Sequence, residues 1–209
     1  MQYDGWAEGY DRRWRRYTAR THAALLAHAD LSGAMNVLEV GCGTGDVIRR
    51  LGARWPHLHI LGVEPSIGMR HVAMAKLAPL VKAGGHMVLA AGDAAALPVP
   101  DGSMDAVVLA NVLHYVPAPL AALAEARRVL RPGGQLLVVD YVPRGLPLTL
   151  ADALIRAYDH GHQHTRSCAA LANLLTRAGF SVYRSLTFPI YHCLDGVVLL
   201  AVGPPSGQC

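Results

Sequence analysis

The chain has little charge and no long apolar run. Asp, Glu, Lys and Arg make up 16% of its 209 residues, whereas hydrophobic residues make up 52%. This balance excludes a disordered chain, because disordered chains are rich in charge and poor in apolar residues. No stretch reaches the roughly 18 apolar residues of a membrane span, and the N-terminal residues are polar where a signal peptide would be apolar. We therefore expect a soluble, cytoplasmic protein with one globular domain and a substantial core.

Cysteine is scarce as well. The four cysteines, at positions 42, 168, 193 and 209, form no Cys-x-x-Cys pair. This argues against a zinc knuckle or a disulfide framework. The formal net charge of +4 is modest, and much of the excess lies in the arginines between residues 12 and 20. A short basic helix of this kind favours weak contact with an anionic partner such as a membrane surface. It does not indicate a nucleic-acid interface.

Glycine is concentrated at one point of the chain. The apolar residues 37–40 run into glycines at 41, 43 and 45, and residues 46–51 continue with helical spacing. A buried parallel strand that ends in a glycine-rich turn and enters a helix is the nucleotide-binding corner of a doubly wound fold. A purely structural tight turn is the alternative. The dinucleotide fingerprint would have its third glycine at position 46, where Asp46 would repel a pyrophosphate.

Acidic residues follow the next two predicted strands. Glu64 ends the strand 57–64, about 20 residues after the glycine loop, where a carboxylate can hold the two hydroxyls of a ribose. Dehydrogenases have an acid at the same place, so Glu64 supports an adenosine ligand without choosing the cofactor. Asp93 follows the third strand, which starts at Met87. It could serve the ligand or simply form a turn.

The order of these segments resembles the class I S-adenosylmethionine (SAM)-dependent methyltransferases of the ubiquinone/menaquinone-biosynthesis type. The matching patterns are Y-D-x-x-A-x-x-Y-D at 3–11, E-x-G-x-G-x-G at 39–45, G-D-A-x-x-L-P-x-x-D-x-x-x-D-x-V at 92–107, N-x-L-H-x-V at 111–116 and R-V-L-R-P-G-G-x-L-x-V-x-D at 128–140. The resemblance implies an α/β, Rossmann-like, doubly wound sheet of seven strands with helices on both faces. The sheet would be mostly parallel, with its last strand antiparallel. The Pro-Gly-Gly of the final pattern predicts a sharp reversal before a strand at 135–141.

The resemblance also implies SAM as cofactor and S-adenosylhomocysteine (SAH) as product. Asp93 would accept a hydrogen bond from the adenine amine, and Asn111 would face the methionine part of SAM or the substrate. The residues expected to contact the cofactor are Tyr10, Tyr17, Glu39, Gly41, Cys42, Gly43, Gly45, Glu64, Pro65, Met69, Asp93, Ala94 and Asn111.

The N-terminal segment has a regular aromatic pattern. Aromatic residues from Tyr3 to Tyr17 recur at three- and four-residue steps, so residues 3–29 are predicted to form amphipathic helix. The aromatic face could simply pack on the domain. Alternatively the segment is a lid across the cofactor mouth, in which Tyr10 or Tyr17 closes on the ligand. We divide the chain into this lid (1–30), a SAM-binding half (31–141), an insertion (142–166) and a C-terminal helix and hairpin (167–209).

Substrate contacts are expected around the insertion, because substrate identity usually lies in such segments. Near-neutral titration makes His114 a candidate general base, although it could instead cap or pack the following helix. Histidines at 160, 162 and 164 suggest a metal site, but Gly161 interrupts the helix and no second cluster completes a ligand set. We therefore favour a solvated loop and expect no metal. The predicted substrate contacts are His114, Tyr115, Tyr141, His160 and His164.

These patterns together favour a methyltransferase acting on a small, fairly apolar molecule by in-line displacement. Such an enzyme works mainly by positioning, so strong acid–base residues are not required. A lipid or membrane-surface substrate and a non-catalytic SAM-binding protein are the alternatives. An NAD(P)-linked oxidoreductase is disfavoured because the last glycine of its fingerprint is missing. The apolar C-terminal strands could also form a homodimer, and the sequence does not choose among carbon, nitrogen, oxygen and sulfur as the acceptor atom.

Overall fold

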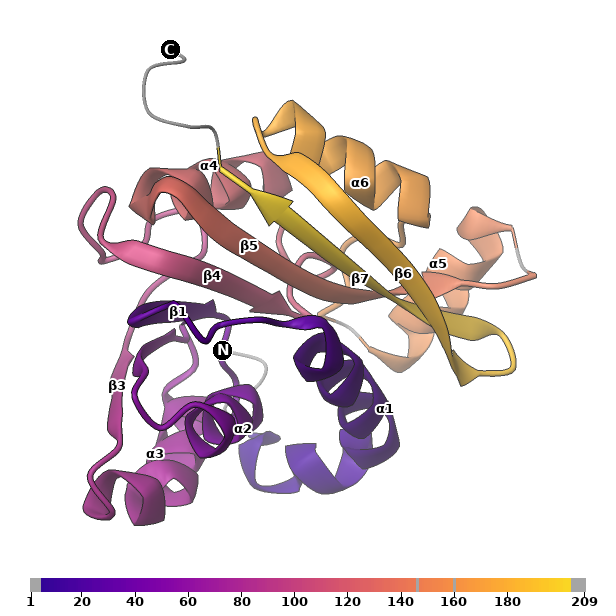
Figure 1. Ribbon diagram of the computed structural model, residues 1–209. Helices are drawn as coiled ribbons and strands as arrows, with labels where there is room; N and C mark the ends of the chain where they lie inside the picture. Colours follow the sequence, from indigo (N-terminus) through magenta and orange to yellow (C-terminus); the bar gives the residue numbers. More distant parts are fainter. Residues whose placement is uncertain (1–4, 146, 160, 204–209) are drawn as a thin grey trace.

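The fold is built on one mixed sheet of seven strands. A computed structural model describes residues 5–145, 147–159 and 161–203. The strands lie in the order β3-β2-β1-β4-β5-β7-β6 (Figure 1). All run parallel except β7, which is antiparallel to β5 and β6, so the expected fold class is confirmed. The strands are β1 (Asn36–Val40), β2 (His59–Val63), β3 (His86–Ala90), β4 (Met104–Ala110), β5 (Leu130–Pro143), β6 (Ser181–Tyr191) and β7 (Leu194–Val202).

Helices cover both faces of the sheet. Helices α4 and α6 pack with the strands in one apolar core, and α1, α2 and α3 contribute to a second core on the other face. Helix α5 lies beyond the end of β5, away from both layers (Figure 1). The helices are α1 (Ala7–His28), α2 (Asp46–Arg54), α3 (Ile67–Lys82), α4 (Pro119–Val129), α5 (Leu148–Tyr158) and α6 (Cys168–Arg177).

The central strands are buried on both faces, which explains their continuous apolar sequences. In β4, Val107 and Leu109 face the core of α4 and α6, whereas Ala106 and Val108 face the opposite core. This alternation follows from the pleat of a strand, and burial of both faces is typical of a parallel sheet covered by helices. The sheet therefore gives a rigid base for the loops at the ends of its strands.

The strand order reverses between β1 and β4, since β2 lies on one side of β1 and β4 on the other. In doubly wound sheets the ligand crevice opens at this point, outside the carboxyl ends of the strands. The backbone is unusual here. Gly41, Gly43 and Gly45 have φ of 67°, 51° and 77°, and Asn111 at the end of β4 has φ of 59°. Such angles in a residue with a Cβ are uncommon and concentrate at functional sites.

One predicted turn is absent. The segment Arg131–Gly134 was expected to reverse the chain sharply, but it belongs to β5, which begins at Leu130. The pairing of β5 with β4 shifts register here, from Met104 opposite Leu130 to Ala106 opposite Gln135. The extra residues are therefore accommodated as an irregularity of the strand. A bulge of this kind uses the same glycine-rich chemistry as a turn.

Candidate functional site

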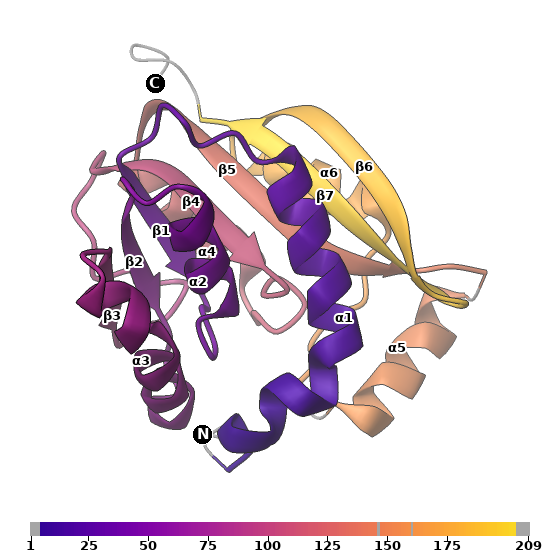
Figure 2. The same cartoon turned by 60° about the horizontal axis from the view of Figure 1, so that its bottom comes forward.

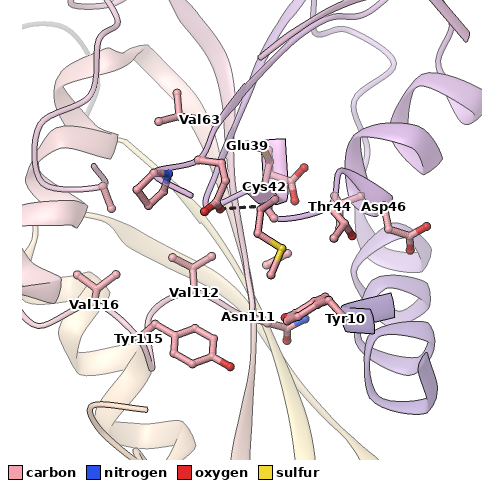
Figure 3. A pocket seen from close by; sticks show the side chains of 18 of the residues that line it. Tyr10, Glu39, Cys42, Thr44, Asp46, Val63, Asn111, Val112, Tyr115 and Val116 are labelled. Carbon is pink, nitrogen blue, oxygen red and sulfur yellow. Dashed lines mark hydrogen bonds between the residues drawn. The ribbon is translucent and has the colours of Figure 1, made fainter. Parts of the chain in front are cut away.

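Two cavities adjoin at the carboxyl ends of the strands. The first, of about 230 Å³, lies between the glycine loop and the ends of β1, β2 and β4. The second, of about 270 Å³, is lined by residues of α1, α5 and the strand ends of β5, β6 and β7. Tyr10, Asn111 and Tyr115 line both cavities. Figure 3 shows these three side chains together with Glu39 and Cys42 around the first cavity.

Most of the predicted cofactor contacts line the first cavity. Gly45 and Tyr17 do not. Gly45 packs on α3, where an added Cβ would lie 3.1 Å from the Cβ of Ala73, and Tyr17 lines the second cavity instead. The predicted residues that line the first cavity are Tyr10, Glu39, Gly41, Cys42, Gly43, Glu64, Pro65, Met69, Asp93, Ala94 and Asn111.

Some lining residues have no signal in the sequence. Thr18 and His22 lie on α1, one turn apart. Their spacing is ordinary for a helix. Only the approach of α1 to the glycine loop makes them part of the cavity, so sequence reasoning could not have found them.

Glu39 is a buried carboxylate in the wall of the first cavity. Its side chain is almost fully buried, and its Oε2 atom has no hydrogen-bond partner in the part of the chain that the structure describes. Burial raises the pKa of Glu39 well above its ordinary value, with Asp46 and Glu64 adding to the shift. A buried acceptor without a partner carries a free-energy cost that a cationic ligand group would remove. This position therefore fits a ligand with a positive charge.

Glu64 fastens the glycine loop to the end of β2. Its Oε2 accepts the backbone N–H of Gly43 at 3.0 Å, and its Oε1 accepts the N–H of Ser66 at 2.9 Å. A carboxylate can accept about four hydrogen bonds, so both oxygens can also accept from hydroxyl groups. Asp93 likewise forms a turn, through a 2.8 Å bond from the N–H of Ala95, and lines the cavity at the same time. The turn and the ligand interpretations of Asp93 are compatible.

Helix α1 is tied to the rim of the first cavity at two places. Asp11 accepts from the hydroxyl of Thr44 at 2.6 Å and from Lys76 at 2.5 Å. Further along α1, His22 contacts Asp46 at 2.9 Å. Figure 2 shows α1 running across the open end of the sheet from the β5–β7 side toward α3. The helix thus forms a wall of the site.

Asp46 lies at the start of α2 and is the residue that His22 contacts. Burial alone would raise the pKa of Asp46, but hydrogen bonds from His22, Arg50 and Arg49 outweigh burial and hold it well below its ordinary value. The distances to Arg49 and Arg50 are 2.8 and 2.7 Å. A permanently charged Asp46 also interacts favourably with the N-terminus of its own helix.

Asn111 joins β4 to α1. Its Oδ1 accepts from the hydroxyl of Tyr17 at 2.8 Å, and its Nδ2 donates to Thr21 at 3.0 Å. Both bonds are buried, and burial raises the pKa of the Tyr17 phenol well above its ordinary value. Tyr17 therefore holds the end of β4 in place from the side of the second cavity.

The second cavity has aromatic walls. Tyr17 and Tyr141 meet edge to face with 6.3 Å between ring centroids, and Trp14 and Tyr17 meet in the same way at 6.1 Å. Leu154 and Ile155 of α5 close another side. Such surfaces suit a flat, apolar molecule, because aromatic rings prefer offset or edge contacts with other rings. The remaining lining residues are Tyr10, Asn111, His114, Tyr115, Asp159, Tyr191 and Leu194.

Three polar side chains of this cavity are each paired with another polar group. His114 Nδ1 lies 2.6 Å from Asp140 Oδ1. The hydroxyl of Tyr115 donates to Asp159 Oδ2 at 2.5 Å. The hydroxyl of Tyr141 lies 2.7 Å from a ring nitrogen of His162. The predicted substrate contacts His114, Tyr115 and Tyr141 are thus brought together on one cavity wall.

The histidine cluster differs from the expected solvated loop. His162 is buried, and its ring lies 2.8 Å from Asp152 in addition to its contact with Tyr141. Burial is the main cause that lowers the pKa of His162. The solvated-loop interpretation is therefore wrong for His162, because two partners distant in the sequence enclose it. His164 is exposed and lines neither cavity, and His160 lies outside the described residues.

Two negative findings apply to the described ranges alone. Within residues 5–145, 147–159 and 161–203, no group of three or more His, Cys, Asp or Glu side chains could hold a metal ion. Over the same ranges, none of the helices has both the length and the apolar character needed to cross a membrane.

Comparisons with known proteins agree with this geometry. A family model described as a methyltransferase domain matches residues 38–138. A ubiquinone/menaquinone biosynthesis C-methyltransferase of Syntrophotalea carbinolica is 36% identical over 140 residues, which are 67% of this chain and 55% of that protein. Its counterpart from Desulfotalea psychrophila is 30% identical over 192 residues, which are 82% of this chain and 73% of that protein. The chain thus spans little more than half the length of the first relative.

The solved structures show the same fold. The YcgJ protein of Bacillus subtilis superposes with a TM-score of 0.77 at 17% identity, covering 90% of this chain and 100% of that chain. At this identity the likeness concerns the arrangement of helices and strands, and the chemistry has to come from the site itself.

Proposed function

The chain belongs to the class I SAM-dependent methyltransferases of the ubiquinone/menaquinone-biosynthesis type, and on this premise we propose that it methylates a small, fairly apolar molecule. The first cavity would hold SAM and the second the acceptor. The observation that carries this assignment is the junction of the two cavities at Tyr10, Asn111 and Tyr115. The junction would let an acceptor and a cofactor meet while the two keep separate binding surfaces.

The residues of the first cavity fit SAM. The unpaired oxygen of Glu39 suits its ammonium group. The carboxylate of Glu64 can accept from the ribose hydroxyls, and Asp93 can accept from the adenine amine. When bound, SAM supplies a methyl group on a positively charged sulfur, which becomes a neutral thioether in SAH. The positive φ of Gly41 and Gly43 lets the backbone of the loop come close to the ligand.

The protein's own contribution is to position and enclose the reactants. Helix α1 is held on the rim by Asp11 and His22, and α5 closes the second cavity with Leu154 and Ile155. Aromatic and aliphatic walls exclude water and restrict a flat molecule to few orientations. Such restriction can supply roughly 7–11 kcal/mol of a barrier when nucleophile and methyl carbon are aligned.

The relatives help to narrow the acceptor. Their names assign them to ubiquinone and menaquinone biosynthesis as C-methyltransferases. The aromatic walls formed by Tyr17 and Tyr141 support a quinone-like, flat acceptor for this chain as well. We therefore propose a ring molecule with few charges as the acceptor.

Methyl transfer with SAM carrying an isotopically labelled methyl group tests this function. The acceptors are naphthols, naphthylamines and reduced naphthoquinones, each offered separately. We expect label in at least one ring acceptor and none in short peptides or nucleic acid. SAM binding without transfer to any acceptor would favour a non-catalytic SAM-binding protein.

A second candidate is an acceptor presented at a membrane surface. Leu148, Leu150 and Leu154 of α5 are 43%, 47% and 57% exposed, and Leu154 also lines the second cavity. Exposed apolar side chains on a helix that lines a cavity are an arrangement suited to take up a lipid-borne molecule. Flotation with anionic vesicles distinguishes this candidate from a freely diffusing acceptor.

A further inference from the structure

We propose that His114, oriented by Asp140, is the general base of the second cavity, and that the acceptor therefore carries an ionisable hydroxyl group. The acceptor class is a flat, apolar phenol or enol. This inference rests on the proposed methyl transfer and adds to it the group that takes the acceptor's proton.

The first observation is the geometry of the pair. His114 lies in the loop after β4, and Asp140 lies on β5. Their Nδ1 and Oδ1 atoms are 2.6 Å apart, with the two side chains only 7% and 2% exposed. The same Oδ1 also accepts the backbone N–H of Tyr141 at 2.8 Å, which fixes the carboxylate. A buried carboxylate at Nδ1 selects the tautomer with its proton there and leaves the lone pair on Nε2.

The second observation is that Nε2 is available to a ligand. His114 lines the second cavity. Within the described part of the chain, its Nε2 makes no hydrogen bond. This nitrogen is also not one of the fully buried atoms without a partner, so it is accessible from the cavity. The ring is held between Tyr115 and Tyr141, with centroids 4.0 and 4.6 Å away. A histidine with only a packing role would normally have both nitrogens satisfied.

Two carboxylates, Asp140 and Asp159, lie at the wall of the second cavity that carries His114. Asp140 supplies the compensating negative charge, and its Oδ2 has no hydrogen-bond partner among the described residues. Tyr115 is bound to Asp159, whose carboxylate adds a second negative charge to this wall. The positively charged Arg166 faces them, because its side chain donates to the carbonyl of Leu113. Burial lowers the pKa of His162, the other basic group beside this wall.

The step is a single proton transfer coupled to methylation. The O–H bond of the acceptor breaks, and its proton moves to Nε2 of His114. The released electron pair, on oxygen or on a conjugated ring carbon, forms the bond to the methyl carbon. The sulfur–methyl bond breaks with its pair going to sulfur. If a ring carbon receives the methyl group, the C–H proton of that carbon is then lost to solvent and the oxygen regains its proton from His114, so either route releases one proton overall.

Binding of 4-nitrophenol to the protein saturated with SAH tests the proposal, because its phenolate absorbs visible light and its neutral form does not. An apolar cavity alone would favour the neutral phenol. A base pair of His114 and Asp140 would favour the phenolate. We expect the wild type to increase the phenolate-to-phenol ratio at least tenfold at a pH just below the point where the free probe ionises. The variants His114→Gln and Asp140→Asn should lose this increase.

His71→Gln is the matched control, since His71 is exposed on α3 and lines neither cavity. Calorimetric binding of SAH checks that each variant is folded. Labelled methyl transfer to a naphthol should fall by about 10²- to 10⁴-fold in His114→Gln. No phenolate increase in the wild type, or an equal increase in both variants, would overturn the proposal. In either case normal SAH binding would leave the proposed function standing, whereas loss of SAH binding by the wild type would refute both.

Discussion

Two buried carboxylates, Glu39 and Asp140, each have one oxygen atom without a hydrogen-bond partner in the described part of the chain. Leaving a buried acceptor unsatisfied costs about 1–3 kcal/mol. Both carboxylates lie near the two cavities, Glu39 in the wall of the first and Asp140 behind His114 in the second. The cost is therefore incurred where a ligand or a proton can offset it.

The raised pKa of Glu39 leads to a prediction about proton release. Burial makes the carboxyl hold its proton to a higher pH than usual, and an arriving ammonium group lowers that pKa again. Binding of SAH should thus release protons, with the largest effect at pH values between the two pKa values. Titration calorimetry in two buffers of different ionisation enthalpy measures this release, and Glu39→Gln should abolish it. Equal heats in both buffers for the wild type would contradict the assignment of Glu39.

Sequence reasoning located single residues at the first cavity where a short pattern fixes a backbone shape. Gly41, Gly43 and Glu64 are examples. It was less successful for Tyr17, which was expected to close on the ligand and instead donates to Asn111. Helical spacing indicates that Tyr17 shares a face with Tyr10. It cannot indicate which partner, 94 residues away in the chain, that face will meet.

At the scale of elements, the segment between α5 and α6 shapes the acceptor side of the site. The backbone N–H groups of Gln163 and His164 donate to the carbonyl of His114 at 2.8 and 3.3 Å. His162 bridges Tyr141 of β5 and Asp152 of α5. This segment therefore holds the wall that carries His114. Its stability should depend on the protonation of His162.

The pH dependence follows from the lowered pKa of His162. Between its folded pKa and the ordinary histidine value of about 6.5, the unfolded chain binds a proton that the folded chain does not. The stabilisation by neutral His162 is therefore fully present above the ordinary histidine pKa. It decreases as the pH falls toward the folded pKa, by at most about 1.4 kcal/mol per pH unit. Urea unfolding at pH 7.5 and pH 5.5 measures the effect. The decrease should be smaller in His162→Gln and unchanged in His71→Gln, whereas equal decreases in all three proteins would contradict it.

Elements were predictable to different degrees. The helices and strands near the glycine loop follow from periodicity, because each buries one regular apolar face. The irregularity at Arg131–Gly134 was mistaken for a turn, since Pro-Gly-Gly permits both and only the pairing of β5 with β4 decides. The burial of His162 was missed for a similar reason. Its partners Tyr141 and Asp152 are 21 and 10 residues away.

At the scale of the whole molecule, the fold provides two adjoining cavities and one helix that borders both. The first could be foreseen, because a strand, a glycine loop and two acids imply it in any doubly wound sheet. The second could not. Its walls come from α1, α5, the loop after β4 and the ends of three strands, which are brought together only by the complete topology. The polar character of one wall, and so the role of His114, depends on that assembly.

The most direct test asks whether the first cavity binds the cofactor and the second does not. It is a calorimetric titration of SAM, SAH and NADH against the wild type, Asp93→Ala and Leu154→Asp. We predict binding of SAM and SAH to the wild type and none of NADH. Asp93→Ala, in the first cavity, should weaken SAH binding by about 1–3 kcal/mol through the lost hydrogen bond to adenine. Leu154→Asp, which alters the second cavity only, should leave it unchanged. Binding of NADH, with neither SAM nor SAH bound by the wild type, would contradict the account and return Glu64 to the ribose site of a dehydrogenase.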